Sequence, residues 1–436
     1  MLTLLSGLIF VSDAHAFTPV SGILTSDVTW TKANSPYYFT GNVIVASGVT
    51  LTIEPGVTVN LGNYYLDVNG TLNARGISSD KIVFQTNSTY SFFTRQITFT
   101  RYSKGWDEQT GQGCIIENAV LKSIVILING ASPKIANSET DNGILISSGS
   151  PIVTNNNLNL QNNGINIMGG SPIISSNTLS GTGFAMGIFG SGNVTLSNNK
   201  ISKFSTGIKI YSGNYVIIEN SITECSNGIE VGVGVMATIQ KNLINNNIHY
   251  GISGGSAYID SNTITNNKIG VHNPTAGSII HNNNILGNTV NSITATTADI
   301  DATNNWWGTT DTAAINKTIY DRKIDYTLGK ATFVPILTAP NPSAPAIPEI
   351  INAPISTPNP STEPTATPTI PPAPTFTPMP TRNPVPKSGT DQASPLLSLN
   401  LLVTAVAIPL IITWLIVILG YSLKAKISKF RAKNWQ

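Results

Sequence analysis

Charged and aromatic side chains recur at one position of a repeated sequence unit. Each copy of the unit opens on a glycine, and the residue two places after it is Phe189, Lys209 and Glu230 in three successive copies. Tyr211 stands two residues beyond Lys209, and His272 occupies the same position as Glu230, two copies later. Lysine, glutamate and histidine can exchange protons with a substrate, and aromatic faces suit pyranose rings. The pattern predicts a sugar-binding strip, to which His272 could also contribute. Its four main members are Phe189, Lys209, Tyr211 and Glu230.

The same residues also have a plainer interpretation. Lys209 and Glu230 are neighbours in successive copies. They would then form a cross-strand ion pair on a solvated sheet, which contributes only a few tenths of a kcal/mol.

A second outward-facing column stands two residues before a recurring asparagine. Asp260 and His281 are neighbours in it, so they could orient a base or bind a metal. Three converging ligands are not apparent, and a polar column facing solvent is the alternative. The candidate metal ligands, two of which share this face in the last copy, are Asp260, His281, Asp299 and Asp301. We expect no cofactor, with Ca²⁺ the one ion left open.

Two registers of equal period must position these residues. The period is about 21 residues. The first register consists of the glycines Gly143, Gly164, Gly187, Gly207, Gly228, Gly251 and Gly270. The second consists of the asparagines Asn156, Asn177, Asn199, Asn220, Asn242, Asn262 and Asn283, ending at Asn304 or Asn305. Apolar residues three before and two after each asparagine keep the same period, which predicts a solenoid of short strands with stacked side-chain ladders.

Asparagine and glycine suit the bends of such a coil. Asparagine tolerates the left-handed backbone conformation, and its amide can hydrogen-bond to the copy stacked on it. Glycine permits a tight corner.

These registers resemble the right-handed parallel β-helix superfamily, the pectate-lyase-like fold with three strands per coil. The resemblance covers roughly residues 20 to 337 and implies an all-β solenoid with room for about 12–13 coils. In members that are enzymes, the substrate lies on the outer face of one sheet, carboxylates hold Ca²⁺ and a basic residue acts as base. By that resemblance, Lys209, Glu230 and His272 are candidate catalytic residues of a polysaccharide lyase or glycoside hydrolase.

Two features argue against catalysis. Successive repeats differ by only a few residues, which leaves no room for the long loops that form a cleft in such enzymes, and no arginine occurs between Arg101 and Arg322. The stretch from Tyr90 to Gly113 is the one place where a long loop could overhang the coils.

The repeat is also similar to the periplasmic copper-binding accessory protein of nitrous-oxide reductase. Copper would need clustered histidine, methionine and cysteine ligands. Here those residues are scattered, so we do not expect copper binding. They are His249, His272, His281, Met168, Met186 and Met236.

The ends of the solenoid are predicted to be capped. Residues 17–41 would form an N-terminal cap, 42–309 the repeats and 310–338 a C-terminal cap. Trp307 falls on a rung that carries leucine or isoleucine in earlier copies and could close the core. A short helix from Asp311 to Tyr320 and a last strand from Ala331 to Leu337 would follow.

The remaining segments predict an anchored surface protein. Residues 1–16 read as a signal peptide, and 339–390 as a stalk holding 16 of the chain's 26 prolines. An uncharged apolar stretch at 396–423 predicts a transmembrane helix, and the basic residues of 424–436 would place the tail in the cytoplasm. This order of segments resembles archaeal cell-surface proteins.

Charge and cysteine content exclude some partners. Setting aside the five basic residues of the tail and Asp13 leaves 19 basic and 21 acidic residues, so no basic surface for nucleic acid is expected. Cys114 and Cys225 lie about five coils apart, too far for a disulfide. We therefore expect a monomeric, membrane-anchored cell-surface protein that binds polysaccharide or cell-envelope glycan, or serves as a structural or adhesive module.

Overall fold

The computed structural model describes residues 17–86 and 95–348. The predicted signal peptide, transmembrane helix and cytoplasmic tail lie outside these residues, as does the stalk from residue 349 onward. Within the described ranges, no helix is long and apolar enough to cross a membrane.

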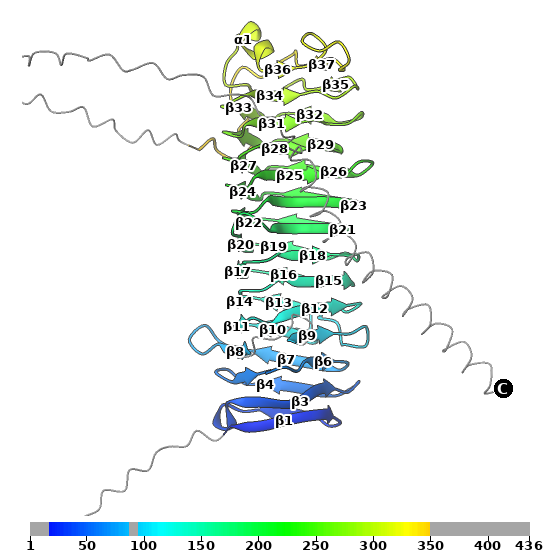
Figure 1. Cartoon of the computed structure of the whole chain (residues 1–436), viewed down its shortest axis with the longest axis vertical. Helices are drawn as coiled ribbons and strands as arrows, with labels where there is room; N and C mark the ends of the chain where they lie inside the picture. Colours follow the sequence, from blue (N-terminus) through cyan, green and yellow to red (C-terminus); the bar gives the residue numbers. More distant parts are fainter. Residues whose placement is uncertain (1–16, 87–94, 349–436) are drawn as a thin grey trace, which may run out of the picture. The chain divides into compact units, whose positions relative to one another are not determined.

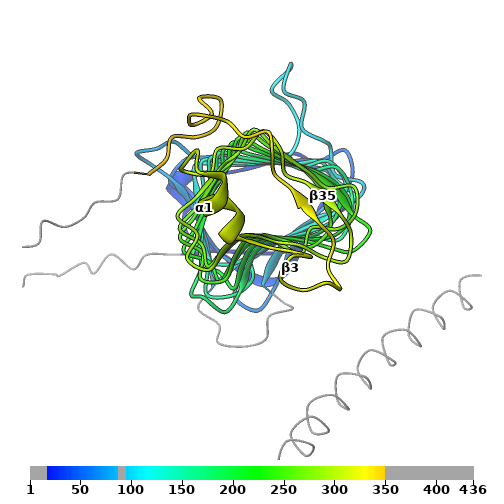
Figure 2. The ribbon, with the colours of Figure 1, turned by 90° about the horizontal axis from the view of Figure 1, so that it is seen from above.

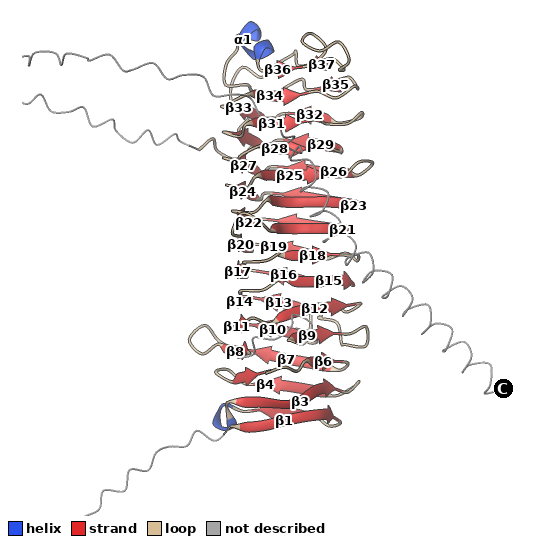
Figure 3. Cartoon of the chain, viewed as in Figure 1, coloured by secondary structure: helices blue, strands red, loops and turns tan. Residues whose placement is uncertain are grey.

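The chain winds into a parallel β-solenoid of about 13 turns (Figure 1). Almost all regular structure is strand (Figure 3). Viewed along its axis, the stacked coils superimpose into one tube (Figure 2). Each coil contributes one strand to each of three stacks, which we call sheets 1, 2 and 3, and strands of one stack pair in parallel. The predicted three-stranded coil is confirmed.

The strands of each sheet follow in chain order. Sheet 1 contains the second part of β3 (Tyr37–Val45), β6 (Leu66–Val68), β9 (Gln96–Phe99), β12 (Val125–Asn129), β15 (Ile144–Ser148), β18 (Ile165–Ile167), the first parts of β21 (Met186–Ser197) and β23 (Thr206–Ile218), β25 (Asn227–Val231), β28 (Tyr250–Ser253), β31 (Ile269–His272), β34 (Asn291–Thr294) and β36 (Ile319–Tyr320). Sheet 2 contains β2 (Val28–Trp30), β4 (Thr50–Ile53), β7 (Thr71–Arg75), β10 (Ile115–Glu117), β13 (Lys134–Ala136), β16 (Ile152–Thr154), β19 (Ile173–Ser175), the second parts of β21 and β23, β26 (Met236–Gln240), β29 (Ser256–Asp260), β32 (Ile279–His281), β35 (Ile300–Asp301) and β37 (Ala331–Thr332). Sheet 3 contains the first part of β3, β5 (Thr58–Asn60), β8 (Ile82–Gln85), β11 (Ala119–Lys122), β14 (Glu139–Thr140), β17 (Asn157–Asn159), β20 (Thr178–Ser180), β22 (Lys200–Ser202), β24 (Ser221–Thr223), β27 (Leu243–Asn245), β30 (Thr263–Thr265) and β33 (Asn284–Leu286).

The asparagine register forms a buried ladder at the bend between sheets 2 and 3. Asn220 accepts hydrogen bonds at Oδ1 from the backbone N–H and the amide of Asn199, both at 2.9 Å. Its own amide donates to the Leu196 carbonyl and to Oδ1 of Asn242. The same pattern runs from Asn156 to Asn305, and its asparagines are at most 3% exposed. The predicted ladder is confirmed, and Asn305 rather than Asn304 is its last member.

The reason given for asparagine at this bend was partly wrong. The ladder asparagines do not have the left-handed backbone conformation. The residue before each of them has it instead, with a positive φ, as at Asn155 (57°) and Glu219 (58°). Hydrogen bonding from coil to coil therefore explains the asparagines, while the left-handed turn accepts several residue types.

The register glycines permit close approach rather than a left-handed corner. A Cβ on Gly164 would lie 2.2 Å from the carbonyl oxygen of Gly187 in the next coil, and one on Gly228 2.4 Å from that of Gly251. Successive coils touch at this point, so only a hydrogen atom fits.

A second asparagine column, not predicted from the sequence, lies at the bend between sheets 3 and 1. Asn247, Asn267 and Asn288 bond to one another as the first ladder does. Below them Cys225 takes the same place, and its backbone N–H donates to Oδ1 of Asn247. Cys225 is fully buried and makes no disulfide.

The N-terminal residues 18–41 form stacked strands of the solenoid itself. The first strand, β1 (Thr18–Leu24), pairs in parallel with both parts of β3 across an irregular register, and a short 3₁₀ helix, η1 (Lys32–Asn34), precedes β3. Trp30 stacks on Tyr37 with ring centroids 4.9 Å apart and fills the end of the core.

At the C-terminal end, Trp307 lies in the core, 6% exposed, with its ring edge-on to Phe333. The predicted capping helix is shorter than expected: α1 (Thr312–Lys317) is capped by the Asp311 carboxylate and buries Ile315. The last strand is also shorter than expected: β37 covers only Ala331–Thr332.

The start of the proline-rich segment packs against the solenoid. The backbone N–H of Asn341 donates to Oδ1 of Asn284 at 2.8 Å, and the Thr263 hydroxyl donates to the Pro345 carbonyl. Thr263 and Asn284 are thereby 0% and 2% exposed, although they face away from the core. The folded body therefore extends past residue 339, where the stalk was predicted to begin.

Candidate functional site

One column of side chains runs up the outer face of sheet 1. The strand register pairs Phe189 with Lys209, and Lys209 with Glu230. The pairing continues upward through Ser253 to His272 and downward through Asn166 to Leu145. The order expected from the glycine register is therefore the order in the structure.

Lys209 and Glu230 form an ion pair on this face. Lys209 Nζ lies 2.8 Å from Glu230 Oε1, and the two side chains are 28% and 33% exposed. The hydrogen bond to Glu230 raises the pKa of Lys209 above its usual value, although partial burial opposes the rise. The lysine therefore keeps its proton at neutral pH, which suits binding rather than proton abstraction.

Tyr211 lies on the same face as Lys209, at a bulge in the strand. The pairing of β21 with β23 skips Tyr211, because Gly190 pairs with Ile210 and Ser191 with Ser212. The Tyr211 ring lies 5.6 Å from Lys209 Nζ, and its hydroxyl lies 3.6 Å from the Met186 sulfur. Its side chain is 47% exposed.

Phe189 differs from the expectation of an open aromatic face. It is only 7% exposed, so it supplies the floor of the site rather than a free stacking surface. Of the two aromatic residues expected to contact sugar, Tyr211 is the one that solvent can reach.

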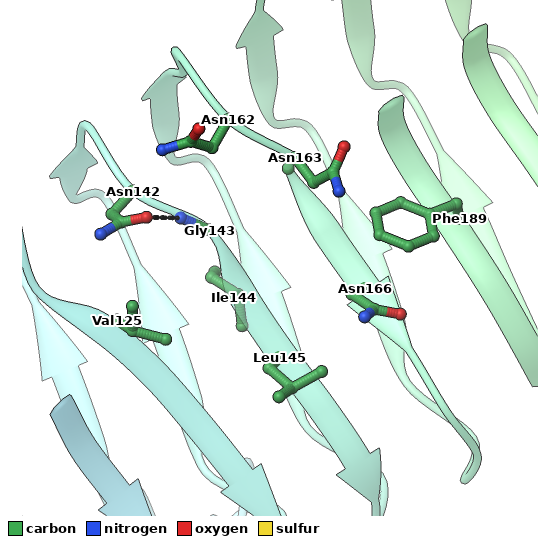
Figure 4. A pocket seen from close by; sticks show the side chains of 10 residues that line it. Val125, Asn142, Gly143, Ile144, Leu145, Asn162, Asn163, Asn166 and Phe189 are labelled. Atoms are coloured by element: carbon green, nitrogen blue, oxygen red, sulfur yellow. Dashed lines mark hydrogen bonds between the residues drawn. The ribbon is translucent and has the colours of Figure 1, made fainter. Parts of the chain in front are cut away.

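A groove of about 330 Å³ adjoins the strip and includes Phe189 in its lining (Figure 4). Its apolar wall includes Leu145, and carboxamides of Asn142, Asn163 and Asn166 border it. The Asn142 and Asn163 Oδ1 atoms accept from the Gly143 and Met186 backbone N–H groups, at 3.0 and 2.9 Å. Within the described part of the chain, their Nδ2 groups and the whole Asn166 carboxamide make no hydrogen bond.

Sequence reasoning missed Asn142 and Asn163. Both lie in the bend before sheet 1, and the chain is rich in asparagine, so nothing in their spacing distinguished them.

His272 stands apart from the ion pair. Ser253 lies between Glu230 and His272 in the column, so two coil steps of about 4.8 Å separate them. Its ring stacks on Tyr250 at 4.1 Å between centroids, and burial lowers its pKa. The structure thus does not bring the three candidate catalytic residues together.

The second predicted column lies on sheet 2, where Asp260 pairs in register with His281. His281 Nε2 instead contacts Asp301 Oδ2 at 3.0 Å, while Asp260 accepts a hydrogen bond from Asn282 at 2.8 Å. Burial raises the pKa of Asp301, but hydrogen bonds from Thr303 and His281 outweigh it and lower the pKa overall.

Asp299 points to different partners. Its carboxylate accepts from the Lys330 backbone N–H and lies 3.6 Å from Arg322 Nη2. Among the residues described, no three histidine, cysteine, aspartate or glutamate side chains are grouped to hold a metal ion.

Residues 102–269 match the family model described as Right handed beta helix region. No curated protein and no solved structure matches the chain. The matched stretch contains the groove, the ion pair and most of the asparagine ladder, so the family model and the stacked parallel strands agree on the architecture around the site.

Proposed function

We propose that this parallel β-helix protein binds polysaccharide along the outer face of sheet 1. The observation that carries the proposal is the groove beside Phe189, in which asparagine side chains with unpaired Nδ2 groups border an apolar floor. Sugars offer both hydroxyl groups and apolar ring faces, and such a surface matches both.

The stacking of coils favours a polymeric ligand. Side chains on sheet 1 repeat at the strand spacing of about 4.8 Å, so a chain lying along the axis meets a new residue at each coil. Leu145 and Phe189 line the groove, and above Phe189 the same outer column continues to the Lys209–Glu230 pair beside exposed Tyr211. An acidic sugar would find the Lys209 ammonium at one end of this surface.

The charge state of Lys209 supports binding over cleavage. A lyase needs a base that can lose its proton, but Glu230 holds Lys209 protonated. His272, the other candidate base, lies two coils away from Glu230. We also propose that the protein is located at the cell surface, with the glycan-binding coils outside the membrane. The basis is the amino-acid sequence beyond residue 349, where an apolar segment is followed by a basic one.

A glycan-array screen of the full-length protein, with and without Ca²⁺, tests the proposal. We expect retention of intact polysaccharide, and roughly tenfold weaker binding for Tyr211→Ala and for Asn166→Ala, equivalent to about 1.4 kcal/mol. The matched control is Tyr258→Ala, since Tyr258 is a tyrosine of similar exposure on sheet 2.

The other outcomes separate the rival functions. Release of unsaturated, ultraviolet-absorbing oligosaccharides would instead establish a lyase. Absence of any retained glycan would favour a purely structural or adhesive module and overturn the proposal.

A further inference from the structure

A second polar pocket lies on sheet 2, away from the groove of sheet 1. Its volume is about 280 Å³. The floor is formed by outward-facing residues of β4 and β7, and the roof by the loop that joins β9 to β10. That loop, residues 100–114, projects in cyan from the outline of the coils in Figure 2. It belongs to the stretch that the sequence suggested could overhang the coils.

The loop is held in a fixed shape above the pocket. The Asp107 carboxylate accepts from the Gln109 backbone N–H at 2.8 Å, and the Gly111 backbone N–H donates to the Asp107 carbonyl at 2.8 Å. The Lys104 backbone N–H donates to the Gly70 carbonyl, and the Lys104 carbonyl accepts from the Cys114 backbone N–H, so the loop is tied to the coil and closed at its end. The roof is therefore preorganised rather than loose.

The pocket is lined by positive charge without a matching acid. Its lining includes Arg75 and Lys104 but no aspartate or glutamate. The nearby carboxylates are already engaged, since Glu108 pairs with Lys134 at 2.8 Å and Asp107 caps its own loop. In the described chain, neither Arg75 nor Lys104 has a carboxylate within ion-pair distance.

Arg75 is oriented but incompletely satisfied. Its Nη2 donates to the Gly111 carbonyl at 2.7 Å, and its guanidinium lies 4.9 Å from the centre of the Trp106 ring. Its Nε is buried and has no hydrogen-bond partner. Because the guanidinium makes one hydrogen bond and has five N–H groups, it still has donors to offer to an acceptor that enters the pocket.

We propose that this pocket binds an oxyanion of an acidic glycan, a carboxylate or a sulfate group. The guanidinium fork of Arg75 matches two oxygens of such a group, and Lys104 adds a second positive charge. Neutral donors from Thr50, Thr71, Asn73 and Gln112 surround the same space and suit hydroxyls beside the charged group.

Isothermal titration calorimetry with the full-length protein tests this assignment. The probes are a galacturonic-acid oligomer, a sulfated galactose oligomer and a neutral galactose oligomer. We expect one or both acidic oligomers to bind, inorganic sulfate to compete, and affinity to fall as NaCl is raised. Failure of both acidic oligomers to bind, or failure of sulfate to compete, would overturn the proposal.

Two variants locate the binding. Arg75→Gln should weaken it at least tenfold, and Lys104→Gln, at an exposed side chain that the fold does not need, severalfold. The control is Arg322→Gln, an arginine at the far end of the solenoid. Unchanged affinity in both pocket variants would show that the pocket is not the site.

The sheet 1 proposal is separated by its own variants. Tyr211→Ala and Asn166→Ala should leave calorimetric binding at the Arg75 pocket intact, so either proposal can fail without the other.

Discussion

Two surfaces of the same coils differ in what they repeat. The bend between sheets 2 and 3 carries asparagine in eight successive coils, from Asn156 to Asn305. The outer column of sheet 1 over the same coils carries a different residue type at each step from Leu145 to His272. The first surface is buried and bonded from coil to coil, whereas the second faces outward and, apart from the buried Phe189 and Ser253, is half-buried.

The difference shows where each coil is free to vary. A ladder asparagine bonds to the coils on both sides, so a change at one coil leaves two neighbours with unmet hydrogen bonds. A residue on the outer column has only side-chain neighbours. The predictions below test this contrast, beginning with the largest effect.

Removing one rung of the ladder should cost the most stability. In Asn220→Ala, the buried N–H and amide of Asn199 lose their acceptor, and we expect the free energy of unfolding to fall by about 2–4 kcal/mol. Urea unfolding followed by circular dichroism measures it. Asn157→Ala, at the exposed asparagine that directly follows ladder residue Asn156, should change the free energy of unfolding by less than about 0.5 kcal/mol. Equal effects of the two variants would contradict the contrast.

A methyl group at the coil-to-coil contact should have the next largest effect. In Gly164→Ala, the new Cβ would lie 2.2 Å from a backbone oxygen, and the forced shift should destabilise the protein by about 1–3 kcal/mol. Thermal unfolding compares it with Gly105→Ala, where the nearest atom is 3.8 Å from the new Cβ. If Gly164→Ala is tolerated as well as Gly105→Ala, the contact is not limiting.

The two thiols should be inert in the folded protein. Burial raises the pKa of both Cys114 and Cys225 from 9.0 to about 11. Iodoacetamide at pH 8 should therefore label neither thiol until urea unfolds the chain. Between pH 9 and 11 the unfolded chain loses these protons and the folded one keeps them, so the cysteines make the free energy of unfolding decrease as pH rises. Rapid labelling of the native protein would show that these coils open.

Neutralising the ion pair should have the smallest effect on stability. For Lys209→Met combined with Glu230→Leu, we expect a change below about 1 kcal/mol, because a partly exposed pair gains little over its solvated ions. Glycan retention should change more than the urea midpoint does. A loss of stability as large as that of Asn220→Ala would mean that the outer column is structural too.

The sequence predicted features that depend on the period. Lys209 and Glu230 meet because equivalent positions of successive coils must stack, and the same rule places Trp307 on the rung above Ile285. Periodicity in two independent registers leaves few alternatives to a solenoid.

Features that break the period were not predictable from it. The bulge at Tyr211 needs one extra residue in one strand, and the bends that hold Asn142 and Asn163 vary in length. His281 bonds to Asp301 rather than to its register neighbour Asp260, because rotamer and local packing decide among nearby acceptors. The packing of Asn341 on Asn284 joins segments of very different composition, for which sequence pattern offers no signal.

The asparagine ladder also has two different ends. At the lower end, Ser138 takes the place of an asparagine and donates its backbone N–H to Asn156. At the upper end, the Asn305 amide turns to the carbonyls of Ala302 and Thr303 in its own coil. Every coil between these ends presents an Oδ1 acceptor to the coil below and N–H donors to the Oδ1 of the coil above. A gene duplication or deletion of one whole repeat would thus rejoin matching surfaces, so such a protein can change its length over evolution in steps of one coil while the terminating residues stay as they are.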